Sequence, residues 1–281
     1  MSTERLRAGL LVCAAWSATA VAGVVDAPLE TREAGRLVVA VYRDFAPYAQ
    51  GEQGIDVEIA KALAAKLGLA PEIRDYPAAD NVDGDLRNIL WRGHPLWKGR
   101  LADVMMHVPV DPHVMKKNGQ VKILAPYFRE RLVVARSRTR IPQLPTLQVF
   151  TTEKIGVQVE TVEDRYLVSS FGGLLRDNVV HYASASEATA ALLKGEVAAV
   201  MGRQSVIEAA LGSESARFEI AAAPAPGLAT TGWELGLAVK AESTGLAAAL
   251  QRAMADLVAD GSIERIFAKR SITYRSPSTG L

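Results

Sequence analysis

The spacing of hydrophobic residues changes within residues 36–68, and the change predicts a strand, a loop and a helix in that order. Residues 37–41 are leucine, valine and alanine, a composition typical of a strand buried on both faces. A loop rich in polar and aromatic residues follows, and from Ile55 hydrophobic residues recur at every fourth position. Gly68 stands where a glycine commonly ends a helix, so the helix is expected to stop there.

Segments of these two kinds alternate through most of the chain, which predicts an α/β fold. Short apolar or β-branched runs predict further strands at residues 70–76, 101–110, 131–135, 154–159, 179–182, 197–201, 218–222 and 232–240. Helical spacing predicts a helix capped by Asp83 or Asp85, a second that begins at Val162, and others at residues 186–194, 205–211 and 246–257.

The loop at residues 43–54 is the first candidate for a ligand site. In open α/β sheets, the loops at the carboxyl ends of the strands form the binding crevice. Asp44, Phe45 and Tyr48 lie in this loop, so we expect them to contact a ligand. The two aromatic rings either stack on the ligand or pack into the core or hinge of the protein.

The N-terminus has the pattern of a secretory signal. Arg5 and Arg7 precede an uncharged stretch over residues 8–25, within which Ala20-Val21-Ala22 matches a signal-peptidase cleavage site. We therefore predict a signal peptide over residues 1–22 and a periplasmic mature protein. The alternative is an uncleaved membrane anchor, but the many alanine, serine, threonine and glycine residues favour a cleaved signal and no stable anchor.

Composition narrows the chemistry of the chain. The 281 residues carry 32 lysines and arginines against 31 aspartates and glutamates, and no basic segment points to nucleic acid. Cys13 is the only cysteine and lies in the predicted signal, which leaves the mature chain without thiol chemistry. No phosphate-binding glycine motif or nucleophile motif occurs, so we expect neither catalysis nor a cofactor. No metal site is expected either, because a recognised ligand spacing is missing among His94, Asp103, His107, Asp111 and His113.

Two linked motifs suggest a family. Phe45, Pro47 and Tyr48, followed by Gly54-Ile55-Asp56-Val57-Glu58-Ile59-Ala60-Lys61-Ala62-Leu63-Ala64, resemble the opening of the family 3 periplasmic solute-binding proteins, the receptors of polar amino-acid ABC importers. Later segments match the family in the same order, at Ala125-Pro126-Tyr127-Phe128, Gly156-Val157-Gln158 and residues 261–269.

The resemblance implies a two-lobed periplasmic-binding-protein-like (type II) α/β fold, with a hinge of two crossings and a ligand cleft between the lobes. We expect lobe 1 over residues 23–135 plus 241–275, lobe 2 over residues 136–240, and a tail over residues 276–281. Hinge closure around a ligand is the expected motion. A single α/β domain is the alternative. The resemblance further implies a monomer that works with an ABC permease.

The ligand-binding signature departs from the family pattern. The resemblance implies an arginine on the first lobe that grips the carboxylate of an amino acid, yet none occurs between Leu101 and Phe128. It also implies an aspartate after the strand at residues 197–201, where this chain has Gly202 and Arg203. We therefore predict that α-amino acids are not the ligand. The remaining candidates to line the cleft are His107, Glu160, Thr161 and Arg203.

An insertion near residue 91 points to a different partner. The segments at residues 86–94 and 102–111 look like a branch of family 3 associated with quinoprotein methanol and alcohol dehydrogenases, the MoxJ and XoxJ type. Trp91, His94 and Trp97 form either a partner-binding patch or a plug for a cavity. We predict a protein accessory to a periplasmic quinoprotein dehydrogenase. The alternative is an ABC-importer receptor for a small anionic or aromatic solute, and a cleft dehydratase is a more distant one.

Overall fold

The computed structural model describes residues 29–96 and 99–278, so the predicted signal peptide over residues 1–22, Cys13 and Trp97 lie outside the described residues. The strands are β1 Arg36–Tyr42, β2 Ala70–Tyr76, β3 Val104–Pro109, β4 Val121–Ser137, β5 Ile155–Gln158, β6 Val179–Tyr182, β7 Ala199–Arg203, β8 Phe218–Ala222 and β9 Gly232–Lys240. The α-helices are α1 Ile55–Lys66, α2 Val82–Leu86, α3 Pro112–Lys117, α4 Val162–Ser169, α5 Ala185–Leu193, α6 Gln204–Leu211, α7 Thr244–Ala259 and α8 Ser262–Ala268.

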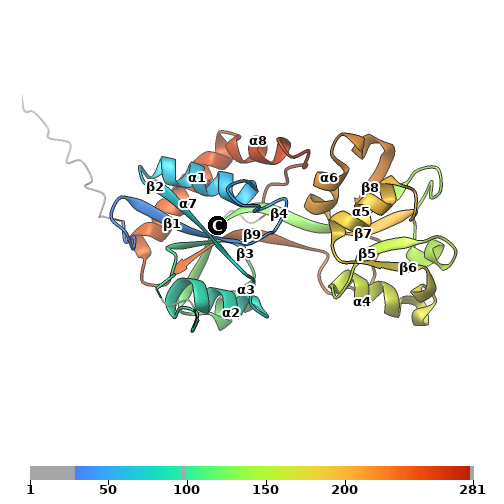
Figure 1. Ribbon diagram of the computed structural model, residues 1–281, viewed down its shortest axis with the longest axis horizontal. Helices are drawn as coiled ribbons and strands as arrows, with labels where there is room; N and C mark the ends of the chain where they lie inside the picture. The colour runs from blue at the N-terminus through green and yellow to red at the C-terminus, as the bar shows by residue number, and fades with distance from the viewer. Residues whose placement is uncertain (1–28, 97–98, 279–281) are drawn as a thin grey trace, which may run out of the picture.

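The chain forms two α/β lobes, as the sequence predicts (Figure 1). The strands follow one path in the order β2-β1-β3-β9-β4-β7-β5-β6, and β8 pairs with β4 outside this path. In the first lobe, β1 pairs with β2 and β3 in parallel. In the second lobe, β5 pairs with β6 and β7 in parallel. Helices connect these parallel strands along the chain. Strands β4 and β9 run antiparallel to their neighbours and extend between the lobes.

Strand β4 belongs to both lobes. Residues 121–131 of this 17-residue strand pair with β9, and residues 132–137 pair with β7 and β8. The strand expected at residues 131–135 is therefore part of the second half of a longer strand, which also includes the Ala125-Pro126-Tyr127-Phe128 motif. Strand β9 was expected in lobe 2 but pairs with β3 and β4 in the first lobe. The lobe boundaries themselves remain a proposal.

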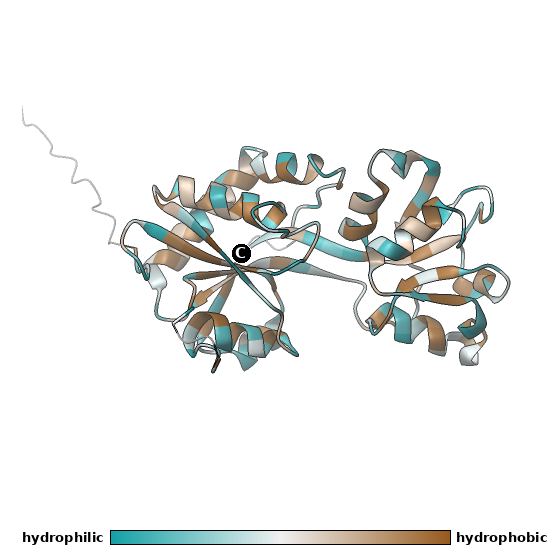
Figure 2. Ribbon diagram, in the orientation of Figure 1, coloured by the Kyte–Doolittle hydropathy of each residue, from teal (hydrophilic) through white to brown (hydrophobic). Residues whose placement is uncertain are grey.

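Hydrophobic residues lie along the strands of both lobes (Figure 2), and buried apolar clusters lie on both faces of each sheet. In the first lobe, helices α1, α7 and α8 cover one face, and α2 packs against the other through Leu86. In the second lobe, Val134 and Val157 face the cluster that includes Leu167 of α4, whereas Val133 and Val200 face α5 and α6. Strands buried on both faces explain why apolar runs in the sequence predicted most strands correctly.

One helix differs from its prediction. Asn81, and not Asp83 or Asp85, caps α2, because its side-chain oxygen accepts a hydrogen bond from Gly84 N at 2.9 Å. Residues Arg87–Trp91 continue α2 as a π-helix, a form that is often found near functional positions. None of the helices within residues 29–96 and 99–278 has the length and apolar character needed to cross a membrane.

Candidate functional site

The loop between β1 and α1 is folded back on itself, which fixes the positions of its aromatic residues. Phe45 and Ala49 exchange backbone hydrogen bonds of 2.7 and 2.8 Å. Gly54 has φ +131°, and a Cβ atom there would lie 2.1 Å from the carbonyl oxygen of Tyr48. Only glycine fits this close approach, so Gly54 lets the start of α1 pack against the loop.

Three of the expected ligand-binding residues lie together. The Phe45 ring stacks beside Tyr48 at 5.7 Å, and His107 contacts the two rings at 4.8 and 4.1 Å between ring centres. His107 lies in a bulge of β3 with φ +61°, which turns it toward the loop. Phe45 is half-buried, whereas Tyr48 is fully buried. Phe45 is therefore the more exposed of the two rings, and Tyr48 serves mainly as core.

Asp56 accounts for the position of His107. This aspartate is fully buried in the first turn of α1 and accepts a hydrogen bond of 2.6 Å from the Tyr127 hydroxyl. Nδ1 of His107 lies 3.2 Å from the other Asp56 carboxylate oxygen. Burial, together with the neighbouring Asp56 charge, raises the pKa of Tyr127 well above its usual range, so its hydroxyl stays a hydrogen-bond donor.

Tyr48 connects the first lobe to the second. Its hydroxyl lies 2.8 Å from Ser205 Oγ in α6 and 3.1 Å from a carboxylate oxygen of Glu130 in β4. The hydroxyl of Ser205 also donates to Glu130, and Glu130 accepts from the backbone amide of Arg131 at 3.0 Å. Burial and the Glu130 charge raise the pKa of Tyr48 well above its usual range. This buried network joins Tyr48 of the first lobe to Ser205 of the second through Glu130 of β4.

Arg203 faces the first lobe from the end of β7. Its guanidinium carbon lies 5.0 Å from the centre of the Phe45 ring, across the space between the lobes. Within the described parts of the chain, this half-buried guanidinium donates no hydrogen bond and forms no ion pair. Glu163 of α4 lies close enough for the Arg203 charge to act on it, but burial is the larger effect and raises the pKa of Glu163.

Glu160 and Thr161 lie at the start of α4, where they have local partners. The Thr161 side chain caps the helix by accepting from Asp164 N at 3.2 Å. Asp164 accepts a hydrogen bond from the Glu160 amide at 2.9 Å and also lies 2.9 Å from His181 Nε2. The exposed Glu160 side chain is therefore not part of the helix cap.

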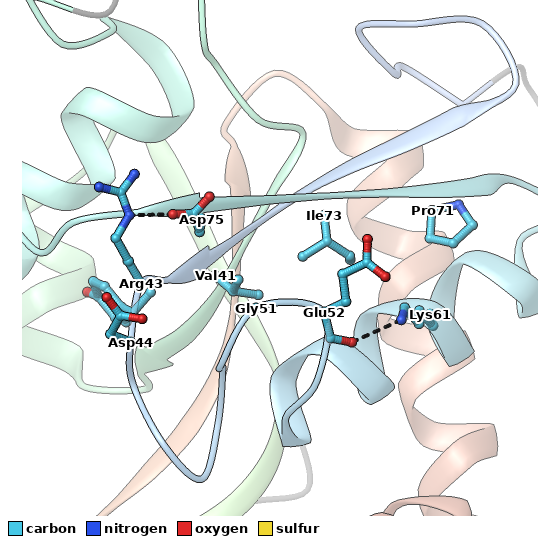
Figure 3. Close-up of a pocket in the computed structure, with 10 residues that line it drawn as sticks. Val41, Arg43, Asp44, Gly51, Glu52, Lys61, Pro71, Ile73 and Asp75 are labelled. Carbon is cyan, nitrogen blue, oxygen red and sulfur yellow. Dashed lines mark hydrogen bonds and ion pairs between the residues drawn. The ribbon is translucent and has the colours of Figure 1, made fainter.

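Asp44 lines a different hollow from the Phe45 cluster. A cavity of about 470 Å³ lies between the loop, α1 and β2, with Val41 and Ile73 in its wall (Figure 3). Arg43 pairs with Asp75 there, and Lys61 donates to the carbonyl oxygen of Glu52 at 3.1 Å. The cavity is formed by first-lobe elements alone, so Asp44 does not join Arg203.

The expected partner-binding residues are only partly exposed. Trp91 is half-buried and packs against the first-lobe core, and His94 is half-buried beside a small hollow near Ile89. Leu96, in contrast, has an exposed fraction of 81%. The insertion thus fills part of the lobe with Trp91 and leaves Leu96 in solvent.

Four residues of the cleft were missed by sequence reasoning. Asp56 stood inside the quoted Gly-Ile-Asp motif, but nothing in the motif showed that its carboxylate meets His107. Glu130 and Ser205 lie 75 residues apart, and Glu163 lacks a motif, so only the fold brings them to the cleft. The described residues contain no group of three or more histidine, cysteine, aspartate or glutamate side chains arranged to hold a metal ion.

Comparison with solved structures defines the fold. An ancestral cationic amino acid solute-binding protein (AncCDT-1) superposes with a TM-score of 0.64 at 18% identity, over 84% of this chain and 96% of that one. The fold is that of the two-lobed periplasmic binding proteins. An amino acid ABC-transporter substrate-binding protein from Streptococcus pneumoniae, bound to L-arginine, gives a TM-score of 0.56 at 20% identity, over 86% and 96% of the two chains.

The periplasmic-binding-protein fold also occurs in proteins with other roles. A histidine kinase sensor domain with similarity to periplasmic binding proteins gives a TM-score of 0.55 at 19% identity, over 86% of this chain and 98% of that one. No protein-family model matches the chain. At these identities the likeness establishes the fold alone.

Proposed function

We propose that this protein is a periplasmic binding protein whose ligand is a small aromatic anion, delivered to an ABC permease. The observation that carries the proposal is the half-buried Arg203 guanidinium, which lies over Phe45 without a hydrogen-bonding partner in the described residues. Five donors in a planar fork match a carboxylate, and hydrogen bonds between ions are about twice as strong as neutral ones. A ring attached to that carboxylate would lie beside the half-buried Phe45 ring.

The same geometry argues against an α-amino acid. Its ammonium group needs a carboxylate when it leaves water, because an unpaired buried charge costs several kcal/mol. Glu163 is one candidate, but Arg203 lies close enough for its positive charge to act on Glu163, so a ligand ammonium there would meet a like charge. On the first lobe, α3 carries Lys116 and Lys117 and no arginine, and Lys117 pairs with Asp83.

Titration calorimetry of the purified protein with benzoate, acetate and phenylalanine tests the proposal. Benzoate combines a carboxylate with an aromatic ring, acetate lacks the ring, and phenylalanine adds an ammonium group. We expect benzoate to bind more tightly than acetate and phenylalanine to bind weakest. Micromolar binding of phenylalanine or of any other standard amino acid would sink the proposal.

Replacing Glu163 by glutamine is expected to strengthen benzoate binding by about 3–10-fold at pH 7, because it removes a negative charge that competes for Arg203. Burial raises the pKa of Glu163, so in the wild type its carboxyl takes up a proton as the pH falls through this raised value. Benzoate affinity should therefore rise on mild acidification of the wild type. The measurement is a series of calorimetric titrations from pH 7 down to pH 5.

Glu196 supplies the matched control for this substitution. It is an exposed glutamate that precedes β7, at the opposite end of this strand from Arg203, and Glu196→Gln removes the same charge far from Arg203. If Glu196→Gln and Glu163→Gln change benzoate affinity equally, or if the Glu163 variant keeps the wild-type pH dependence, Glu163 does not act on the bound anion.

An accessory role beside a quinoprotein dehydrogenase is the second candidate function, and the exposed Leu96 favours it. A large apolar side chain with 81% of its surface in solvent, next to Trp91 and His94, is typical of the centre of a protein-protein contact. This role needs no ligand in the cleft.

Replacing Leu96 by aspartate is expected to weaken binding to a quinoprotein methanol dehydrogenase at least about 10-fold, because it places a charge in an apolar contact. Surface plasmon resonance with the immobilised dehydrogenase is the measurement. Stability should stay within about 0.5 kcal/mol of the wild type, as for most exposed positions. Equal binding by the wild type and by Leu96→Asp would show that Leu96 is not in the contact. No binding by the wild type would rule out the dehydrogenase as the partner.

A further inference from the structure

The chain continues beyond α8 as an extended segment that is anchored in the first lobe. Ile272 is buried in the first-lobe core, and the Tyr274 ring lies 5.5 Å from Phe267. Arg129 in β4 donates its amide to the Arg275 carbonyl at 3.0 Å. At the end of the segment, Ser278 N donates to Glu234 of β9 at 2.7 Å. Residues 272–278 thus lie along both crossing strands, and the expected tail is held at least as far as Ser278.

The same segment reaches the second lobe at helix α6. Thr273 N donates to Glu208 Oε2 at 2.7 Å, and Arg275 Nε donates to Gln204 Oε1 at 3.0 Å. Glu208 and Gln204 have exposed fractions of only 6% and 2%. Helix α6 packs against α5, so it moves with the second lobe (Figure 1).

Other first-lobe and hinge residues hold the same turn of α6. Ser205 contacts the Tyr48 hydroxyl at 2.8 Å, and Gln204 also accepts from Arg131 in β4. The polar residues on this face of α6 therefore find partners in the loop after β1, in β4 and in the C-terminal segment. Rotation of the lobes about β4 and β9 would separate these buried polar groups, which is unfavourable unless water replaces every partner.

We propose that residues 272–278 are a strap that ties α6 to the crossing strands and holds the two lobes in one arrangement without a ligand. Hinge closure around a ligand is the common motion of two-lobed binding proteins, and the strap opposes it. The cleft of this protein is then set before binding. This inference does not depend on which molecule the cleft accepts.

The distance between two spin labels, one on each lobe, tests the strap in the ligand-free protein. Lys116→Cys in α3 and Ala190→Cys in α5 are exposed labelling sites in a Cys13→Ser background, since Cys13 is the only other cysteine. We expect a single narrow distance distribution for the labelled protein. Arg275→Ala or Glu208→Ala should add a second population displaced by more than about 2 Å, the scale of a domain rearrangement.

Arg270→Ala is the matched control, because Arg270 pairs with Glu58 at 2.6 Å within the first lobe and has no bond to α6 among the described residues. The control should keep the narrow distribution. Circular dichroism shows whether each variant is folded. If Glu208→Ala unfolds, Arg275→Ala still tests the strap, because Arg275 is only half-buried. Two populations in the ligand-free parent, or unchanged distributions in the folded strap variants, would overturn the proposal.

Discussion

Replacing Arg203 by alanine is expected to lower the affinity for benzoate about 100-fold, the largest change that any single cleft substitution should cause. A hydrogen bond to a charged group contributes about 1.5–3 kcal/mol, and a 100-fold change in Kd corresponds to about 2.7 kcal/mol. Since Arg203 makes no hydrogen bond or ion pair within the described residues, its removal leaves no buried partner behind. Isothermal titration calorimetry against wild type measures the change.

Two further variants show whether the planar guanidinium matters. Arg203→Lys keeps the charge but not the bidentate fork, so we expect a loss of about 10-fold. Arg217→Ala is the matched control, because Arg217 stacks on Phe218 at 5.6 Å on the surface of the second lobe. It removes an arginine–phenylalanine contact of the same kind outside the cleft. Benzoate binding by Arg203→Ala within threefold of the control would rule out Arg203 as the anion-holding residue.

Replacing Glu130 by alanine is expected to destabilise the protein by about 3–5 kcal/mol, the largest loss of stability among these variants. Glu130 has an exposed fraction of 1% and accepts hydrogen bonds from Tyr48, Ser205 and the amide of Arg131. Without it, these buried donors lose their acceptor, and breaking a buried network of this kind has costs of that size. Urea unfolding followed by circular dichroism measures the free energy of unfolding.

The surface glutamate Glu196 provides the comparison for this loss. It pairs with Lys194 at 4.0 Å, and its side chain is 56% exposed, so Glu196→Ala should change the free energy of unfolding by less than about 1 kcal/mol. Tyr48→Phe removes one donor to Glu130 and should cost about 1 kcal/mol. A Glu130→Ala protein as stable as Glu196→Ala would show that the network is not a structural anchor.

The local elements were predictable because their signals are local. Apolar, β-branched runs gave β2, β6, β8 and β9 their correct bounds, and the four-residue spacing from Ile55 gave α1. The π-helix after α2 was not predictable, since its sequence has ordinary helical spacing. Only residues 131–135 of β4 were predicted as a strand, because Pro126 and charged residues interrupt the apolar pattern in the earlier part of the strand.

The candidate site was harder to predict, because its contacts join distant parts of the chain. Loop position correctly brought Phe45 and Tyr48 to the side of the first lobe that meets the second, yet only the fold shows that Tyr48 is buried against Ser205. Arg203 was a candidate to line the cleft, because the family resemblance implies an aspartate after the strand at residues 197–201, where this chain has Gly202 and Arg203. Its stacking on Phe45 depends on how the two lobes meet, which no local pattern encodes.

The path of the chain through the two sheets has a consequence for the order of folding. Strand β9, at residues 232–240, lies between β3 and β4 in the first sheet, so the first lobe stays incomplete until the chain has been made almost to its end. The second-lobe strands β5 to β8 lie in one continuous stretch and need only the end of β4. Because the chain is synthesised from its N-terminus, the second lobe can fold first. The first lobe, although its strands begin the sequence, completes its sheet last.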